Sequence, residues 1–221
     1  FKREGEITGI VPLTKYNTYQ FNIKSLYSKN SSISNDSLDF IHKGLQILEV
    51  NKLNINKLID FIYNNNNSFE TIIIPDISQL ITLVTNKTYI IYCVLENSHF
   101  KAIYFFKDSQ MKYKLHHERE NRDNNNNNNN NNNIKSIDLF ASINLIHDNN
   151  LFIELFKLIL NKCNKNNLFD LITIENISHN NSIINYLFML KLLPVIVSPT
   201  AYFYYNYAKK PILPEKALII C

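Results

Sequence analysis

Few side chains in this sequence stand where they could do chemistry. The adjacent His116 and His117 are followed by Glu118 and Glu120, and all four are residue types that can bind a transition metal. They lie in a charged run that leads into a tract of asparagines, and such runs are usually solvated surface. We therefore interpret the four as surface residues and expect no metal site.

The cysteines are candidates for nucleophiles. Cys93 and Cys163 lie within apolar periodic runs, where burial disfavours the reactive thiolate, so we interpret them as core residues. The third cysteine, Cys221, ends the sequence. An odd number of widely spaced cysteines without a secretory signal is typical of reduced thiols, so we expect a cytoplasmic protein.

Composition argues against several classes of function. The net charge is only +4 and basic residues do not cluster, so no nucleic-acid surface is expected. The chain has three glycines, too few for the Gly-x-Gly loop that would hold the pyrophosphate of CoA, so a self-sufficient acetyltransferase is not expected. No stretch reaches the roughly 18 to 20 apolar residues that span a bilayer, so no transmembrane segment is expected.

Hydrophobic periodicity predicts the elements that would position these residues. The clearest is an antiparallel hairpin, in which two runs of β-branched and aromatic residues flank the turn signal Glu96-Asn97-Ser98. The helix at 151–163 is apolar nearly all round, which predicts cover on more than one side. The expected helices are 14–27, 38–41, 55–63, 78–84, 151–163 and 182–191, and the expected strands are 6–13, 69–74, 89–95, 99–106, 134–146, 169–175, 202–207 and 215–221.

This order of elements predicts one α/β domain over residues 1–221, of the mixed α+β kind, with a mixed sheet flanked by helices. The aromatic run Tyr202–Tyr207 and the aliphatic run that ends at Cys221 are separated by prolines. We expect these two runs to form two strands joined by a stiff turn that complete the sheet.

An uninterrupted asparagine tract, Asn124–Asn133, cannot pack into a core. We expect a disordered Asn-rich insertion at residues 121–133. Deleting the ten asparagines should change the melting temperature little, because a disordered loop makes few contacts. Differential scanning fluorimetry would test this, and a loss of several degrees would contradict it.

Four segments of the chain resemble N-myristoyltransferase, specifically its C-terminal half. Gly9–Leu13 resembles the family's Gly-Leu-Arg-Pro-Met, and Cys93–Asn97 resembles its Phe-Val-Val-Glu-Asn hairpin. Phe169-Asp170 resembles its Gly-Phe-Asp-Val strand start. Tyr202–Tyr207 resembles its Tyr-Tyr-Leu-Tyr-Asn-Trp, and Glu215-Lys216 with the aliphatic run resembles its ending. The resemblance implies a Gcn5-related, acyl-CoA N-acyltransferase-like fold in which residues 30–55 and the asparagine tract are insertions.

The resemblance also implies a function, which is transfer of myristate from myristoyl-CoA to the N-terminal glycine of proteins. In that family the N-terminal half binds myristoyl-CoA and the C-terminal half builds much of the peptide groove. The chain begins at Phe1, so we expect an upstream acyl-CoA-binding half, without which this piece is inactive. If Cys221 is the true terminus, its carboxylate would take the proton of the glycine amine. Ile219 and Ile220, together with Ser109 and Ile134, would then line the peptide groove.

The sequence departs from the family's pattern at one place that matters. The family's Gly-x-Gly-Asp-Gly-x-Leu loop should precede the tyrosine run, but residues 193–201 contain neither glycine nor aspartate. Prolines and β-branched residues cannot make the tight turns of a glycine loop. This departure favours the alternative of a catalytically dead, acyltransferase-like binding or scaffold module. A third reading is a partner-binding domain of an unrelated α/β fold.

Overall fold

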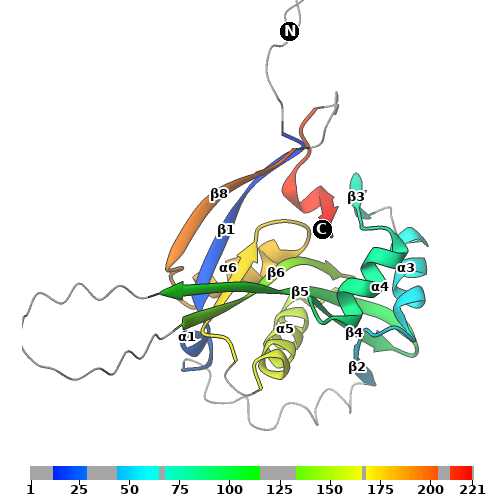
Figure 1. Cartoon of the computed structure of the whole chain (residues 1–221), viewed down its shortest axis with the longest axis horizontal. Coiled ribbons are helices and arrows are strands. Elements are labelled where there is room, and N and C mark those ends of the chain that lie inside the picture. The colour runs from blue at the N-terminus through cyan, green and yellow to red at the C-terminus, as the bar shows by residue number, and fades with distance from the viewer. Residues whose placement is uncertain are drawn as a thin grey trace, which may run out of the picture.

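The computed structural model describes residues 12–28, 44–64, 68–114, 133–165, 168–203 and 210–220. Within them a seven-stranded sheet has the order β2-β4-β5-β6-β7-β1-β8, and β3 and β9 form a parallel pair. The fold is mixed α/β, as predicted (Figure 1). The strands are β1 (Thr14–Asn22), β2 (Leu45–Glu49), β3 (Thr71–Ile73), β4 (Tyr89–Glu96), β5 (His99–Lys114), β6 (Asn133–Asn144), β7 (Leu171–Glu175), β8 (Ile196–Tyr202) and β9 (Ala217–Ile219). The helices are α1 (Ile23–Ser28), α3 (Ile55–Asn64), α4 (Ile77–Thr85), α5 (Asn149–Cys163), α6 (Asn180–Met189) and the 3₁₀ turn η2 (Pro214–Lys216).

The predicted hairpin is present as β4 and β5, which pair antiparallel. Asn97 and Ser98 both have positive φ, 49° and 66°. Two successive residues with positive φ make the tight kind of turn that matches the twist of paired strands. The turn signal in the sequence therefore identified this connection correctly.

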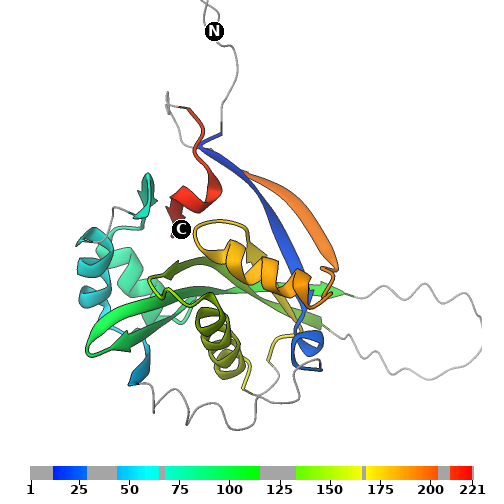
Figure 2. The same ribbon diagram turned by 180° about the vertical axis from the view of Figure 1, so that it is seen from behind.

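One face of the sheet is covered by α5 and α6, which lie side by side in Figure 2. Alternate residues of the strands, such as Ile137 and Ile172, point into the core that these helices share with α1. The largest buried side chains of this core are aromatic, among them Tyr104 and Phe156. Burial on the sheet side and contact with α6 account for the nearly all-apolar sequence of α5.

The other face is covered over only part of its width. Helices α3 and α4 pack on β4 and β5 there, and Leu218 and Ile220 close the same core from the C-terminal segment. Residues 217–220 lie between the β1–β8 ribbon and the α3–α4 pair in both views (Figures 1 and 2). On this face no described helix packs over β7, β1 or β8.

The helix predicted at 14–27 is wrong over most of its length. Residues Thr14–Asn22 form β1, which pairs antiparallel with β7 on one side and β8 on the other. Tyr19 and Phe21 both point toward Phe188 of α6. Their side chains thus share one face at a spacing of two residues, as in a strand. The aromatic residues of this segment also fit a helical spacing. Pairing with a neighbouring strand on each edge decided in favour of the strand.

The C-terminal run does not complete the main sheet as expected, because β9 pairs with β3 in the second sheet. Of the aromatic run expected as a strand at 202–207, Tyr202 ends β8, which pairs with β1. Most of β8 comes from residues that we interpreted as a replaced glycine loop, and it carries Pro199 on the outermost strand, where a missing N–H is tolerated. The edge strand β2 lies within the segment 30–55 that the resemblance makes an insertion. The predictions for residues 6–11, 38–41, 121–132, 204–207 and Cys221 concern positions outside the described residues.

Candidate functional site

The parallel strands β6 and β7 separate part of the way along the sheet. They pair from Ser136–Leu171 to Leu139–Ile174. Beyond that point β6 continues, but it no longer pairs with β7. Asn180, at the start of α6, spans the point of separation. Its Nδ2 donates to the carbonyl oxygens of Leu139, at 3.2 Å, and Glu175, at 2.8 Å. One buried amide thus holds the two strands and the helix together.

The gap between the separated strands is filled by the loop between β7 and α6. The backbone N–H of Ser142 donates to Ser178 Oγ at 3.1 Å, and that of Asn144 donates to His179 Nδ1 at 3.0 Å. His179 N–H donates in turn to the carbonyl oxygen of Ser142. Backbone groups freed by the separation are therefore satisfied from within the chain, as buried polar groups must be. This gap offers no free row of backbone groups to a ligand.

His179 should make the stability of the protein depend on pH. Burial lowers its pKa, and the nearby charge of Lys216 lowers it further, against the raising effect of its bond to Ser142. The unfolded chain therefore takes up a proton near the ordinary pKa of about 6.5, before the folded chain does. Stability is present above that pH and is lost as the pH falls through the folded pKa.

We expect His179→Asn to lose less stability than the parent chain between about pH 7.5 and pH 5.5, measured by urea unfolding. The variant's amide oxygen can still accept from Asn144 N–H. The exposed His147, changed in the same way, is the matched control. An identical pH dependence for parent and His179→Asn would contradict the prediction.

A polar strip lies on the part of the face bearing α3 and α4 that no described helix covers. On β6 and β7 the residues that alternate with the buried Ile137 and Ile172 are Ser136, Asp138, Thr173 and Glu175. Their hydroxyls and carboxylates are linked, since Ser136 Oγ lies 3.1 Å from Thr173 Oγ1 and 3.5 Å from Asp138 Oδ1. From β1, Tyr16 OH donates to Glu175 Oε2 at 2.7 Å.

Both carboxylates of this strip resist ionisation. Burial raises the pKa of Asp138, and hydrogen bonds from Thr173 and Ser136 oppose it. Burial also raises the pKa of Glu175; the hydrogen bond from Tyr16 opposes this shift and the charge of Asp138 adds to it. The charge of Asp138 therefore acts on Glu175 as a like charge, while the positive charge of Lys107 opposes the raised pKa of both acids.

A depression of about 340 Å³ opens beside the strip, over β1 and β8. Tyr16 belongs to both features, because its ring lines the depression while its hydroxyl binds Glu175. Tyr16 also packs against a small core cluster that includes Ile219 of the C-terminal segment. The strip, the depression and the C-terminal segment thus meet at one residue. The depression is lined by Lys15, Tyr16, Asn17, Pro199, Thr200 and Ala201.

The site residues named from the sequence fall into two groups. Ser109 is half-buried on β5, and its Oγ donates to the carbonyl oxygen of Ser136 at 2.7 Å, while Ile134 is half-buried on β6. Ile219 is 6% exposed beside Tyr16, and Ile220 is fully buried in the core under α3 and α4. Cys221 lies outside the described residues.

Neither Asp138 nor Glu175 was among the site residues expected from the sequence. A signal was available, since each carboxylate alternates with isoleucines or leucines in a strand. An acidic residue inside a strand-like pattern marks the face of the sheet that lacks apolar cover. Which two acids would meet depended on strand pairing.

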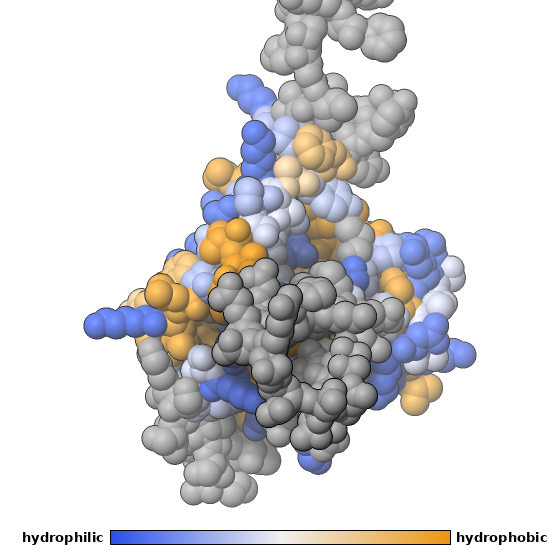
Figure 3. Space-filling model, turned by 60° about the vertical axis from the view of Figure 1, so that its left-hand side comes forward, coloured by the Kyte–Doolittle hydropathy of each residue, from blue (hydrophilic) through white to orange (hydrophobic). Residues whose placement is uncertain are grey.

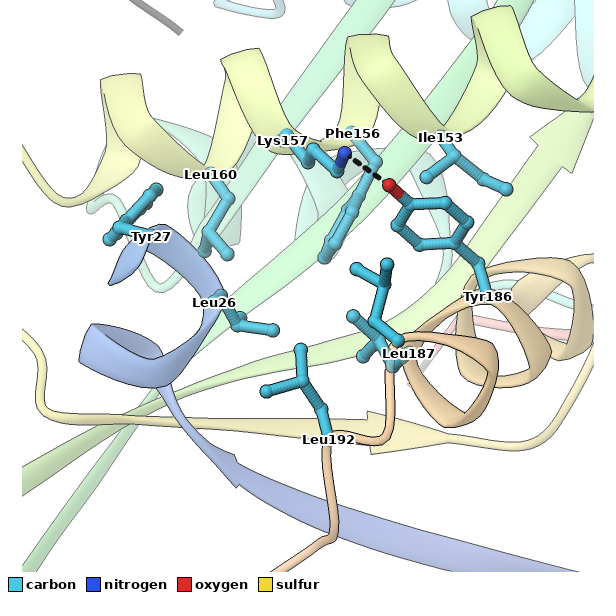
Figure 4. Close-up of a pocket in the computed structure, with 10 residues that line it drawn as sticks. Leu26, Tyr27, Ile153, Phe156, Lys157, Leu160, Tyr186, Leu187 and Leu192 are labelled. Carbon is cyan, nitrogen blue, oxygen red and sulfur yellow. Dashed lines mark hydrogen bonds between the residues drawn. The ribbon is translucent and has the colours of Figure 1, made fainter. Parts of the chain in front are cut away.

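A second cavity lies between α1, α5 and α6, and it is core packing. It measures about 10 Å³, too small for a ligand. In Figure 4 leucine and aromatic side chains point into it from the three helices, and Tyr186 OH meets Lys157 Nζ at 2.6 Å. Lys157 also binds Glu154 at 2.8 Å, so its charge is compensated.

The two described cysteines and the described metal-ligating residues supply no reactive centre. Cys93 is fully buried, and Cys163 packs against the core, as predicted. Burial raises the pKa of both thiols, that of Cys163 to about 12, so both stay protonated. Among the described residues no three His, Cys, Asp or Glu side chains gather as metal ligands; His116 and His117 lie outside them. No described helix is long and apolar enough to cross a membrane.

No protein-family model matches the sequence, and no curated protein matches it. Solved structures do match its fold. A Saccharomyces cerevisiae N-myristoyltransferase with bound myristoyl-CoA aligns over 92% of this chain and 50% of its own, with a TM-score of 0.53 and 15% identity. The same yeast enzyme with myristoyl-CoA and inhibitors aligns over 95% and 52%, with a TM-score of 0.55 and 14% identity.

A third structure of that enzyme gives a TM-score of 0.53 at 16% identity and aligns over 94% of this chain and 54% of its own. The chain thus spans about half the length of the structures that it matches. At such identities the likeness establishes the fold, which is the Gcn5-related acyltransferase fold that the resemblance implied.

Proposed function

We propose that residues 1–221 form one domain, the peptide-binding half of a cytoplasmic glycylpeptide N-tetradecanoyltransferase. The full protein would transfer myristate from myristoyl-CoA to the N-terminal glycine of other proteins. The observation that carries the proposal is the alignment of more than nine-tenths of this chain with about half of an N-myristoyltransferase in three structures. The four matching sequence segments support it independently.

The substrate peptide would lie on the face of the sheet that carries the polar strip, over the strands that no described helix covers there. That face offers the polar strip on β6 and β7, and Tyr16, which binds Glu175 of the strip, also lines the depression over β1 and β8. Ser109 and Ile134 lie at its β5–β6 side, and Ile219 borders it beside Tyr16. An extended peptide needs hydrogen-bonding groups beside apolar walls, which this arrangement supplies.

The chain's own part in catalysis would be that of a base. The carboxylate of Cys221, if it ends the native protein, would take the proton that the glycine ammonium must lose before it attacks the thioester. Ile219 and Ile220 are anchored beside Tyr16 and in the core, and Ile220 N–H donates to Ile73 at 2.8 Å. A rigid segment of this kind would fix the position of the next residue.

Myristoyl-CoA would be held mainly by an upstream half. The gap between β6 and β7 is filled by Ser178 and His179, and Gly44 is the one glycine among the described residues. A hydrophobic patch is available to contact that half. It runs from the end of α6 into β8 and appears as orange surface on the left of Figure 3. Its members are exposed apolar side chains, an arrangement typical of interaction surfaces: Phe188, Met189, Leu193, Val195, Ile196 and Val197.

The second candidate is a binding or scaffold module that keeps the fold without catalysis. It is favoured by β8, which is a regular strand paired with β1 from Thr14–Tyr202 to Gln20–Ile196. The family's glycine loop should lie where most of this strand runs. A continuously paired strand cannot provide the close backbone approach of a glycine turn.

The decisive experiment is acyl transfer by the full-length native protein. It would be incubated with an alkyne-tagged myristoyl-CoA and an octapeptide that begins with glycine, and the control peptide would begin with alanine. We expect acylation of the glycine peptide only, and no transfer by residues 1–221 alone. Binding of the glycine peptide without transfer by the full-length protein would establish the scaffold reading instead.

A further inference from the structure

The hydrophobic patch at the end of α6 has members that the core does not need. Met189 is 80% exposed and Leu193 is 82% exposed, and both lie at the connection from α6 to β8. Leu192, between them, is buried and joins Leu187 in the core that α5 and α6 cover. That core is therefore closed by Leu192, while Met189 and Leu193 project into solvent.

The connection that carries these side chains is held at both ends. Next to α6, Leu192 N–H donates to the carbonyl oxygen of Leu187 at 3.0 Å. Next to β8, Val195 N–H donates to the carbonyl oxygen of Gln20 on β1 at 2.7 Å. A projection that is already ordered loses little conformational entropy when it binds, so this one is suited to contact another surface.

The patch continues from this connection onto the sheet. The ring of Phe188 packs against that of Tyr19 on β1, with centroids 5.5 Å apart. Val197 of β8 pairs with the same tyrosine across the β1–β8 ribbon. The exposed apolar side chains therefore form one surface over α6, β1 and β8, which is the orange surface on the left of Figure 3.

The elements around the patch carry only positive charge. Residues 12–28, with β1 and α1, and residues 176–203, with α6 and β8, contain no aspartate or glutamate. They do contain Lys15, Lys24 and Lys191, and all three lysines are exposed. The acids of the other elements therefore do not interrupt this part of the surface.

Two of these lysines lie beside the patch. Lys191 is part of the connection between α6 and β8. Lys24 lies on α1, whose Leu26 lines the same small cavity as Leu192, whereas Lys15 lies at the opposite end of β1. An apolar projection with cations beside it complements a surface that is anionic outside and apolar inside. A bilayer that contains acidic lipids is such a surface.

We propose that the hydrophobic patch docks the protein on an anionic lipid bilayer. Met189 and Leu193 would insert among the acyl chains, while Lys24 and Lys191 would contact the lipid phosphates. This inference goes beyond the proposed function and does not depend on it.

The composition of the patch favours lipid over the upstream half of the protein. Apolarity alone would fit either occupant. Residues that dominate binding between proteins are most often Trp, Tyr and Arg, with Leu and Val under-represented, whereas this patch consists mainly of Leu, Ile and Val. Side chains that project also need a matching hollow in a protein partner, because protein interfaces are complementary in shape, but a fluid bilayer adapts to them.

The test is co-sedimentation of the full-length native protein with lipid vesicles. One set of vesicles contains phosphatidylcholine alone, and in the other set about one third of the lipid is phosphatidylserine. We expect about tenfold tighter binding to the anionic vesicles, and loss of most of that preference when added salt screens the lysines.

Substitutions separate the apolar and the charged parts of the contact. Met189→Gln and Leu193→Gln should each weaken binding to anionic vesicles about tenfold. Leu53→Gln is the control, because Leu53 is 94% exposed but lies between β2 and α3. Lys24→Gln should lower the preference for anionic vesicles and leave binding to neutral vesicles unchanged. Lys57→Gln, which changes an exposed lysine of α3, should alter neither.

The melting temperature without vesicles tests the other occupants. Because Met189 and Leu193 project into solvent, their variants should melt at the parent's temperature. Lower melting temperatures together with no binding to vesicles would overturn the proposal and assign the patch to the upstream half. A dimer of the parent that is lost in Leu193→Gln, measured by analytical ultracentrifugation, would assign the patch to a second copy and overturn the proposal as well. Equal binding of the parent and Leu193→Gln to anionic vesicles would have the same consequence.

The failure of this proposal can be distinguished from failure of the proposed function. The vesicle assay contains neither myristoyl-CoA nor a glycine peptide, so its result does not depend on acyl transfer. Binding to anionic vesicles by a protein that transfers no myristate would support the bilayer contact and count against the proposed function alone.

Discussion

Replacing Phe156 with alanine will lower the free energy of unfolding by about 3–5 kcal/mol. Phe156 is 1% exposed in the core between α5 and the sheet. Its ring stacks on Phe106, with centroids 6.4 Å apart, and tilts against Tyr104 at 6.3 Å. Truncation would leave a cavity the size of a whole ring. The strands on one side and α6 on the other would keep that cavity from collapsing.

Urea unfolding followed by circular dichroism is the measurement, and Phe188→Ala is the matched control. Phe188 also lies in a helix, but its side chain is 39% exposed. We expect the control to lose about 1 kcal/mol or less, from its contacts with Tyr19 and Phe21. Similar losses of stability for the two variants would mean that Phe156 is not part of the buried core.

Replacing Asn180 with alanine will lower the free energy of unfolding by about 2–3 kcal/mol. Its fully buried amide donates to Leu139 and Glu175, which lie on the two strands that separate at this point. Without the amide, the Leu139 oxygen would lose a donor in a buried place where water cannot replace it. The strands and the start of α6 would also lose a shared link.

Asn181→Ala is the matched control, because Asn181 is the next residue of the same helix and is exposed. We expect it to change stability by less than about 0.5 kcal/mol. Hydrogen exchange adds a local readout, since the amides of Ser142 and Asn144 depend on the loop that Asn180 anchors. Faster exchange there in Asn180→Ala, with β4 unchanged, is the expected pattern. Uniformly faster exchange would point to global destabilisation alone.

The acidic pair connects the candidate site with stability. Asp138 and Glu175 face away from the main core, and their ionised forms weaken the folded state. They differ in this from Lys157, whose charge Glu154 and Tyr186 already satisfy.

Local patterns were sufficient where one strand or helix decides its own structure. The hairpin of β4 and β5 followed from β-branched runs around a turn that tolerates positive φ at Asn97 and Ser98. Helix α5 followed from its length and apolar periodicity, and the sequence order predicted a mixed sheet. The segments that resemble N-myristoyltransferase also predicted a fold that solved structures match.

Tertiary pairing decided what local patterns left open. Residues Thr14–Asn22 have an aromatic spacing that fits a helix, and they became a strand because β7 and β8 offered pairing on both edges. β9 was apolar enough for a strand, whereas most of β8 lies where we expected the place of a glycine loop, and the partners of both strands are far away in sequence. Strand partners are set by long-range packing, which no local window contains.

By itself, therefore, the sequence determined the element types of the central hairpin and of α5, the fold class and the set of chemical groups available. Only the tertiary structure placed Asp138 of β6 beside Glu175 of β7, on a face that no described helix covers. The physical reason is that the charge of one acid acts on the other only after two strands pair in register. Tyr16, from a third strand 159 residues away, completes that site.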